Sequence, residues 1–177
     1  MRDLKANYGG LKPRIRKYAS KNMDVYDVTG ASIIACNDVR RFVYKPDARN
    51  LQHLKSDVMN ADTELLVEIA RAFWEDEGSI SKEANLTGAI KNVKLRNQLL
   101  LIHKKLGIEV NPYTDRVNQM FGVYVRRGNE NLLRFDQIVG FRDSIVTQGV
   151  NVGAPKRSVL LGYLDRERAL DQLSLAS

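Results

Sequence analysis

Three consecutive acids, Glu75 to Glu77, end an apolar segment in the stretch AFWEDEGSI, and a glycine follows them. If that segment is a helix, the acids lie at its C-terminus. The last main-chain carbonyls of a helix carry partial negative charge there, and cations are normally preferred. Three carboxylates at this position oppose the stability of the helix that precedes them. Acids that break a local rule in this way are candidates for chemistry rather than for folding.

The elements that position these acids can be predicted from apolar spacing. Apolar residues recur at i, i+3 and i+4 over 63–77, which predicts a helix with Asp62 or Thr63 as its N-cap and Gly78 as its stop. The elements predicted after it are a short hairpin over 79–90, a helix over 94–107, two strands within 108–128, a helix over 129–141 capped by Asn129 or Asn131, and a closing helix over 156–173.

The composition excludes several classes of protein. The chain has 177 residues, enough for one domain or two small fused lobes. No apolar run approaches the roughly 20 residues of a membrane span, and the N-terminus lacks the apolar core of a secretory signal. The single cysteine, Cys36, cannot form an internal disulfide and fits a reducing compartment, so we expect a cytoplasmic protein without a membrane partner. Two histidines and one cysteine argue against a structural zinc site.

The net charge of +7 is unevenly distributed. Residues 58–78 contain one basic residue (Lys or Arg) and six acidic residues (Asp or Glu). Residues 1–57 contain 12 basic and 6 acidic residues, and residues 79–177 contain 15 basic and 9 acidic residues. A short acidic element therefore lies inside a basic body. A basic body suggests a polyanionic partner such as nucleic acid, although a basic soluble surface without such a partner has the same composition.

Two segments of the chain are similar to each other. Residues 23–43 align with residues 121–141, so that Val25-Tyr26 meets Val123-Tyr124. Agreement in element order, apolar positions and turn glycines indicates a duplicated unit. The first copy has no equivalent of the acidic helix. We therefore predict a partial first repeat over 1–58, with a hairpin and a helix only, and a complete repeat over 59–177 that contains the helix 63–77.

The acidic helix and the elements after it resemble a known family. ARAFWEDEG (70–78) is similar to the nine-residue signature of the LAGLIDADG homing endonucleases. Gly107-Ile108, the segment YVRRGNENLLRFDQIVGF (124–141) and the basic pair Lys156-Arg157 resemble later features of that family. The resemblance covers about 61–175 fully and about 8–58 in part. It implies an α+β fold of αββαββα repeats, with antiparallel sheets packed on helices.

The resemblance also implies a role for the acids. In the family, two such helices pack side by side and their acidic ends converge over DNA, where they bind divalent metal. It implies Mg²⁺ or Mn²⁺ as cofactor, Glu77 as catalytic acid and metal ligand, and Asp76 as a second ligand. Lys55 and Lys156 occupy comparable places in the two copies, either as catalytic basic residues near the scissile phosphate or as ordinary basic residues at helix N-termini.

Double-stranded DNA is the partner that the resemblance implies. Alternation along KPRIRKY places its cations on one strand face, either against DNA or simply in solvent. The residues predicted to contact DNA are Lys12, Arg14, Arg16, Ser79, Ser81, Lys82, Tyr124, Arg126, Arg127 and Arg157.

Two functions follow, and the sequence leaves both open. The first is a homing endonuclease of an intron or intein, which hydrolyses double-stranded DNA at a specific site with magnesium. The second is a catalytically inactive relative that binds DNA or structured RNA as a regulator or splicing helper. The second is suggested by the truncated first copy, by Asp76 at a position that is usually small, and by the short hairpin 79–90. Arg71, also at a usually small position, is a further departure from the family pattern.

The helix 63–77 needs a partner for its apolar face, and the first copy has no matching helix. A two-fold homodimer through Ala70, Ala72 and Phe73 would supply one. In the alternative monomer, residues 1–58 fold back over that face. Trp74 is expected to pack in the core or at a helix interface, and the histidines His53 and His103 are expected to be surface or hydrogen-bonded side chains without a catalytic role.

Overall fold

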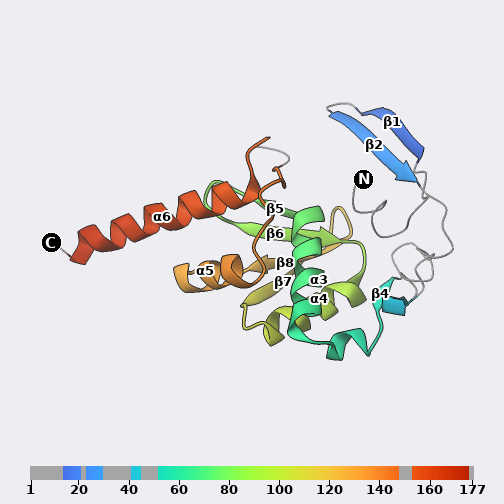
Figure 1. The fold of residues 1–177 in the computed structure, drawn as a ribbon, viewed down its shortest axis with the longest axis horizontal. Coiled ribbons are helices and arrows are strands. Elements are labelled where there is room, and N and C mark those ends of the chain that lie inside the picture. The colour runs from blue at the N-terminus through green and yellow to red at the C-terminus, as the bar shows by residue number, and fades with distance from the viewer. Residues whose placement is uncertain (1–13, 21–22, 30–40, 45–51, 148–152, 176–177) are drawn as a thin grey trace.

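The computed structural model describes residues 14–20, 23–29, 41–44, 52–147 and 153–175 (Figure 1). Lys12 and Cys36 lie outside these ranges. The elements in chain order are β1 (Arg14–Ser20), β2 (Met23–Thr29), β3 (Val43–Tyr44), β4 (His53–Leu54), the 3₁₀ helix η1 (Val58–Asn60), α3 (Thr63–Asp76), β5 (Gly78–Ile80), β6 (Leu86–Ile90), α4 (Val93–Lys105), β7 (Val110–Asp115), β8 (Met120–Val125), α5 (Asn129–Ile138) and α6 (Lys156–Leu175). None of the helices in the described ranges is long and apolar enough to cross a membrane.

Strands β5 to β8 form one antiparallel sheet in the order β5-β6-β8-β7. Helices pack against this sheet (Figure 1), and the order from α3 to α5 is the αββαββα order predicted from the sequence. Burial alternates along β5, where Gly78 and Ile80 are buried and Ser79 is exposed, as expected for a sheet with one covered face. The predicted α+β fold class, with antiparallel strands packed on helices, is confirmed.

The helix N-termini confirm one predicted cap and correct another. The Asp62 carboxylate accepts a hydrogen bond from the Leu65 N–H and caps α3. Helix α5 is not capped by Asn129 or Asn131, because its N-cap is Gly128, with φ of 139° and no side chain to contribute. The Asn131 amide instead bonds to main-chain groups of Glu109 and Arg126, so it joins α5 to the ends of β7 and β8.

Two glycines allow aromatic rings to pack directly against the sheet. A Cβ at Gly88 would lie 2.6 Å from Cζ of Phe73, so the ring of this α3 residue packs directly over β6. A Cβ at Gly122 would lie 2.1 Å from the ring of Tyr113, its cross-strand partner. Both distances are far below normal contact, so these close approaches require glycine.

A buried polar pair connects α3 to α4 inside the core. The Trp74 indole Nε1–H donates to Nε2 of His103 at 2.7 Å, and both side chains are fully buried. The other ring nitrogen, Nδ1, lies 2.7 Å from the Leu99 carbonyl oxygen. One nitrogen accepts and the other donates, so the imidazole is neutral. Burial lowers the pKa of His103 from its ordinary 6.5, and the bond to Leu99 opposes this only in part. The predictions of a packed tryptophan and a hydrogen-bonded histidine are confirmed here.

This pair makes folding stability dependent on pH. Because the pKa of His103 is lower in the folded chain than 6.5, the unfolded chain binds the proton first. The contribution of this pair to the free energy of unfolding should therefore be fully present above pH 6.5 and should decrease as the pH falls below 6.5. Urea titrations near pH 7.5 and pH 5.5, followed by the fluorescence of the single tryptophan, measure this change. His103→Gln should flatten the dependence and His53→Gln should not; equal profiles in all three proteins would contradict the assignment.

The N-terminal part contains two short pairings. Strands β1 and β2 form an antiparallel hairpin, and strand β3 pairs with β4. The hairpin predicted for the first repeat is present, whereas most of its predicted helix falls in 30–40, outside the described residues. The Gln98 side chain of α4 accepts from Leu54 N–H at 2.9 Å and donates to Leu54 O at 2.8 Å. This contact attaches β4 to α4. The division into repeats at residue 58 stays a prediction.

Candidate metal and nucleic-acid site

The three acids at the end of α3 differ in their surroundings. Glu75 is a structural residue, because its side chain is only 8% exposed and is paired with Arg142. The Arg142 main-chain N–H donates to Oε1 of Glu75 at 2.8 Å, and its Nη1 donates to Oε2 at 2.9 Å. The Nη2 of Arg142 also donates to Oε2 of Glu68, which lies seven residues before Glu75 on the same helix, at 2.8 Å. These bonds attach α3 to the segment that follows α5.

Arg71 belongs to the same side of α3. Its Nε–H donates to the carbonyl oxygen of Val139 at 2.7 Å, and its guanidinium pairs with Glu68. Val139 is the C-cap residue of α5, so Arg71 supplies a donor to an otherwise open helix end. The long side chain of Arg71 therefore packs against the C-terminus of α5.

Lys156 supplies the cation that the C-terminus of α3 requires. The residue is 4% exposed, and its Nζ donates to the carbonyl oxygens of Trp74 at 3.0 Å, Glu75 at 2.8 Å and Gly78 at 2.5 Å. Burial lowers the pKa of this ammonium, and the charges of Asp76 and Glu75 partly restore it. All three N–H groups are used by main-chain oxygens. Lys156 therefore offsets the unfavourable end of the helix and positions the acids there.

Asp76 and Glu77 are the exposed acids of this end, and within the described part of the chain neither has an ion-pair partner. Partial burial raises the pKa of Glu77 from its ordinary value, and the adjacent charge of Asp76 adds to the effect. The two carboxylates thus repel each other at a site that a cation would stabilise. Among the described residues no group of three or more His, Cys, Asp or Glu side chains gathers to hold a metal ion. Two carboxylates nevertheless suit Mg²⁺, which commonly takes one or two and completes its shell with water and phosphate oxygens.

A row of polar side chains crosses the open face of the sheet. The register places Ser79 opposite Thr87, Thr87 opposite Tyr124, and Tyr124 opposite Asn111, so one residue comes from each strand. Ser79 Oγ lies 2.9 Å from Thr87 Oγ1. Ser79 is two residues after Glu77, so the row begins beside the acids. A polar sheet face of this kind can present hydrogen-bonding groups to base edges in a groove.

Comparison with known proteins gives a structural likeness and no sequence match. No family model matches the chain, and no curated protein matches it. The structure of I-DmoI in complex with DNA and Mn is similar, with a TM-score of 0.55 and 12% identity over 79% of this chain and 70% of that one. Mesophilic variants of I-DmoI are similar with a TM-score of 0.55 and 11% identity, over 90% of this chain and 71% of that one. The I-DmoI complex with DNA and Ca has a TM-score of 0.55 and 12% identity, also over 90% of this chain and 71% of that one. I-DmoI is a LAGLIDADG homing endonuclease.

The chain has the LAGLIDADG homing endonuclease fold. The helix that carries the three acids is α3, and Glu77 is its C-cap residue. Two of the polar row, Thr87 and Asn111, were not predicted as site residues. Thr87 lies between the buried Leu86 and Gly88, so strict alternation along β6 could have identified it.

The structure brings some of the predicted nucleic-acid residues to the sheet and engages others elsewhere. Ser79 and Tyr124 belong to the polar row. Arg126 lies at the end of β8, where its Nη1 pairs with Glu109 at 2.6 Å, and Arg127 donates to Glu83 O at 3.4 Å. Ser81 lies in a turn, where its Oγ accepts hydrogen bonds from the N–H groups of Glu83 and Asn85, and Lys82 beside it is exposed. Arg157 pairs with Asp143 at 3.3 Å and with Asp136 at 3.7 Å.

The remaining predicted residues are dispersed. Lys55 lines a groove beside α4, whereas Lys156 lies at the end of α3, so the structure does not bring the two lysines together. Arg14 and Arg16 belong to β1. On α3, Ala70 is fully buried in the chain's own core, Phe73 packs over Gly88, and Ala72 is exposed.

Proposed function

We propose that the chain is a metal-dependent endonuclease that hydrolyses double-stranded DNA at a specific site. The observation that carries the proposal is the pair Asp76 and Glu77, unpaired among the described residues and placed where α3 meets the polar row of the sheet. The fold supports it, because the similar I-DmoI structures are complexes with DNA and Mn or Ca. A duplex on the open sheet face would bring a phosphate beside the two carboxylates.

The chain's own residues would divide the work. The polar row would contact base edges, and Lys82, Arg126 and Arg127 would contact phosphates. Asp76 and Glu77 would hold Mg²⁺ or Mn²⁺, which supplies an activated water and stabilises charge on the leaving oxygen when bound. Lys156 would keep the acids in place through its bonds to the α3 carbonyls.

Incubation with plasmid DNA tests the proposal. We expect nicking or linearisation with magnesium or manganese, none with chelator, and a preferred position when a library of target sequences is used. Binding that weakens with salt but produces no cleavage under any metal would support the second function, an inactive relative that binds DNA or structured RNA. That alternative is favoured by the small number of acids gathered at the site in the described residues.

A homodimer would complete the site with acids from a second copy. The residues of α3 that remain open form a stripe at helical spacing, with Leu65 and Ile69 half-buried and Ala72 and Asp76 exposed. The small side chain of Ala72 would allow close approach of an equivalent helix. Packing two such stripes about a two-fold axis would bring both Asp76 residues, and the adjacent Glu77 residues, to one place.

Light scattering should therefore give a mass near twice the 20.1 kDa of one chain. Ala72→Arg should shift the mass toward one chain, because the long cation cannot be packed between two helices. Val117→Arg is the matched control, since Val117 is 90% exposed on the turn between β7 and β8. A wild-type mass of one chain that does not change on concentration would contradict the dimer and favour coverage of the stripe by residues 1–58.

A further inference from the structure

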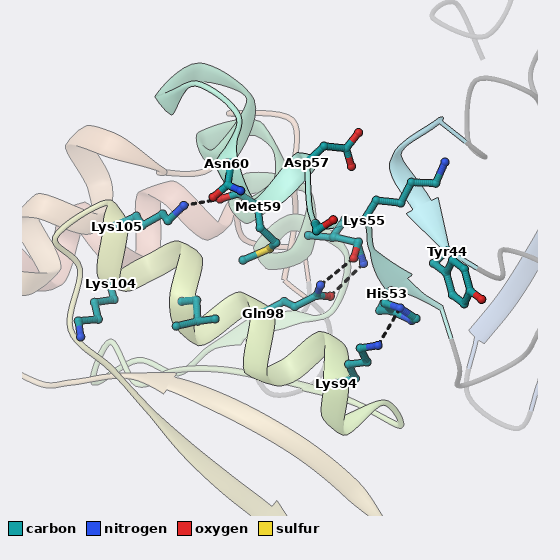
Figure 2. Close-up of a pocket in the computed structure, with 13 residues that line it drawn as sticks. Tyr44, His53, Lys55, Asp57, Met59, Asn60, Lys94, Gln98, Lys104 and Lys105 are labelled. Atoms are coloured by element: carbon teal, nitrogen blue, oxygen red, sulfur yellow. Dashed lines mark hydrogen bonds between the residues drawn. The ribbon is translucent and has the colours of Figure 1, made fainter.

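A groove separate from the sheet runs along the outer side of α4. It has a volume of about 1000 Å³ and lies between α4 and the segment from β4 through η1 (Figure 2). The lining residues are Tyr44, His53, Leu54, Lys55, Ser56, Asp57, Met59, Asn60, Lys94, Gln98, Leu101, Lys104 and Lys105. None of them belongs to β5–β8 or to the acidic end of α3, so this groove is not part of the site described above.

The lining of the groove is strongly basic. It contains four lysines, Lys55, Lys94, Lys104 and Lys105, against one acid, Asp57. Lys94 and Lys105 are eleven residues apart on one helix, which corresponds to about 16 Å along its axis. The positive charge therefore extends in a line, which suits a chain of phosphates better than a single compact anion.

Aromatic and apolar side chains lie beside the lysines of the groove. The rings of Tyr44 and His53 lie in contact at one end of the groove, with centroids 4.9 Å apart and planes tilted by 47°, and Tyr44 is 50% exposed. Lys94 Nζ donates to His53 Nε2 at 2.9 Å, so an ammonium lies beside the aromatic pair (Figure 2). Leu101, 54% exposed, adds apolar surface along α4. Aromatic surface beside a line of cations is the combination that binds unpaired bases and their phosphates.

We propose that this groove binds single-stranded RNA. Its lysines would contact phosphates, and the exposed part of Tyr44 would stack on a base. Ser56, Asp57 and Asn60 lie on the η1 side, where a hydroxyl, a carboxylate and an amide can exchange hydrogen bonds with ribose 2′-hydroxyls and base edges. A duplex offers no unstacked base to the aromatic end. The exposed carboxylate of Asp57 also interrupts the basic line, which favours a ligand with hydroxyl donors over one with phosphates alone.

Lys55 and Lys104 are the residues to change. Neither side chain has a hydrogen bond or ion pair within the described residues, whereas the side chain of Lys94 bonds to His53 and that of Lys105 to the Met59 carbonyl. The double variant Lys55→Glu with Lys104→Glu should therefore leave the fold intact. Arg168→Glu makes a charge reversal of the same sign on α6, where the side chain of Arg168 is 58% exposed. The unfolding transition, followed by tryptophan fluorescence, should be the same in all proteins.

Fluorescence anisotropy with a labelled single-stranded RNA of about 12 nucleotides measures binding. For four phosphate contacts, log K against log salt should have a slope of about −3, because each contact on a single strand contributes about −0.7. The double variant should lower affinity roughly tenfold or more and bring the slope near −1.5, and Arg168→Glu should change neither. DNA of the same sequence should bind more weakly. Equal binding of RNA and DNA, or an unchanged slope in the double variant, would overturn the proposal.

The result is independent of the nuclease proposal. Duplex DNA competitor should not displace the RNA, because the duplex is expected on the sheet face. Displacement by duplex at equal affinity would show that the RNA occupies the sheet face and not the groove. Loss of plasmid nicking with RNA binding intact would instead weaken only the proposed nuclease function.

Discussion

The variant Glu77→Gln should lose metal-dependent cleavage while it keeps its affinity for DNA. The substitution retains the shape of the side chain but removes the charge that a divalent ion requires. Even outer hydrogen-bond partners of a metal ligand are worth about 10- to 100-fold in activity, so loss of a ligand should cost more than about 100-fold. DNA affinity should change little, because one carboxylate fewer lowers repulsion from phosphate only slightly. Nicking rates and filter binding on the same plasmid measure the two quantities.

The adjacent acid gives a matched control. Glu75→Gln removes the same charge one residue away, but Glu75 is committed to Arg142 and its side chain is 8% exposed. This variant should lose stability through the weakened pair and keep most of its cleavage rate at low temperature. If Glu75→Gln abolished cleavage and Glu77→Gln did not, the two roles would be reversed. If neither variant affected cleavage, the acids of α3 would have no part in it.

The second large effect is expected at Lys156. Lys156→Met keeps the length of the side chain but leaves the three carbonyl oxygens of Trp74, Glu75 and Gly78 without their buried donor. A hydrogen bond to a charged group contributes about 1.5–3 kcal/mol, and part of this is recovered when a buried ammonium is removed. We expect a loss of about 2–4 kcal/mol in the free energy of unfolding. Urea unfolding followed by the fluorescence of Trp74 measures it.

Arg168→Met is the control for this effect. It removes a cation from the same helix, where Arg168 is 58% exposed and pairs only loosely with Asp165 at 3.7 Å. Exposed pairs contribute roughly 0–1 kcal/mol, so this variant should be close to wild type. Equal stability of the Lys156 and Arg168 variants would mean that the ammonium does not hold the end of α3. Lost activity with unchanged stability would point instead to a catalytic role.

The elements of the fold were predictable because each is determined by residues that are close together in the sequence. The stripe over 63–77, the stop at Gly78 and the turn between β7 and β8 all depend on neighbours within one or two turns of chain. The cap of α5 was mispredicted for a physical reason. Asn131 has the right chemistry for a cap, but its amide is used by main-chain groups of Glu109, 22 residues earlier, and a glycine takes the cap position.

The candidate site was predictable only in part. Asp76 and Glu77 were identifiable from their conflict with the helix that carries them. The partners that separate Glu75 from them were not, because Arg142 is 67 residues away along the chain. Lys156 was predicted either near the scissile phosphate or as an ordinary basic residue at a helix N-terminus. Its three bonds to main-chain oxygens of α3 and Gly78 could not be predicted, because they depend on how α6 enters the core. The basic groove depends on packing of β4 and η1 against α4, which no single stretch of sequence encodes.

The two halves of α6 differ in burial. Its first residue caps α3 and Leu164 is 3% exposed, whereas Leu170 is 59% exposed and the helix extends away from the sheet (Figure 1). A 20-residue helix is about 30 Å long, so its outer half acts as a stiff arm anchored at the acidic end of α3. A protein fused through this arm would be held in a fixed direction from Asp76 and Glu77. The arm is thus an attachment point for a fused domain that must act beside those two acids.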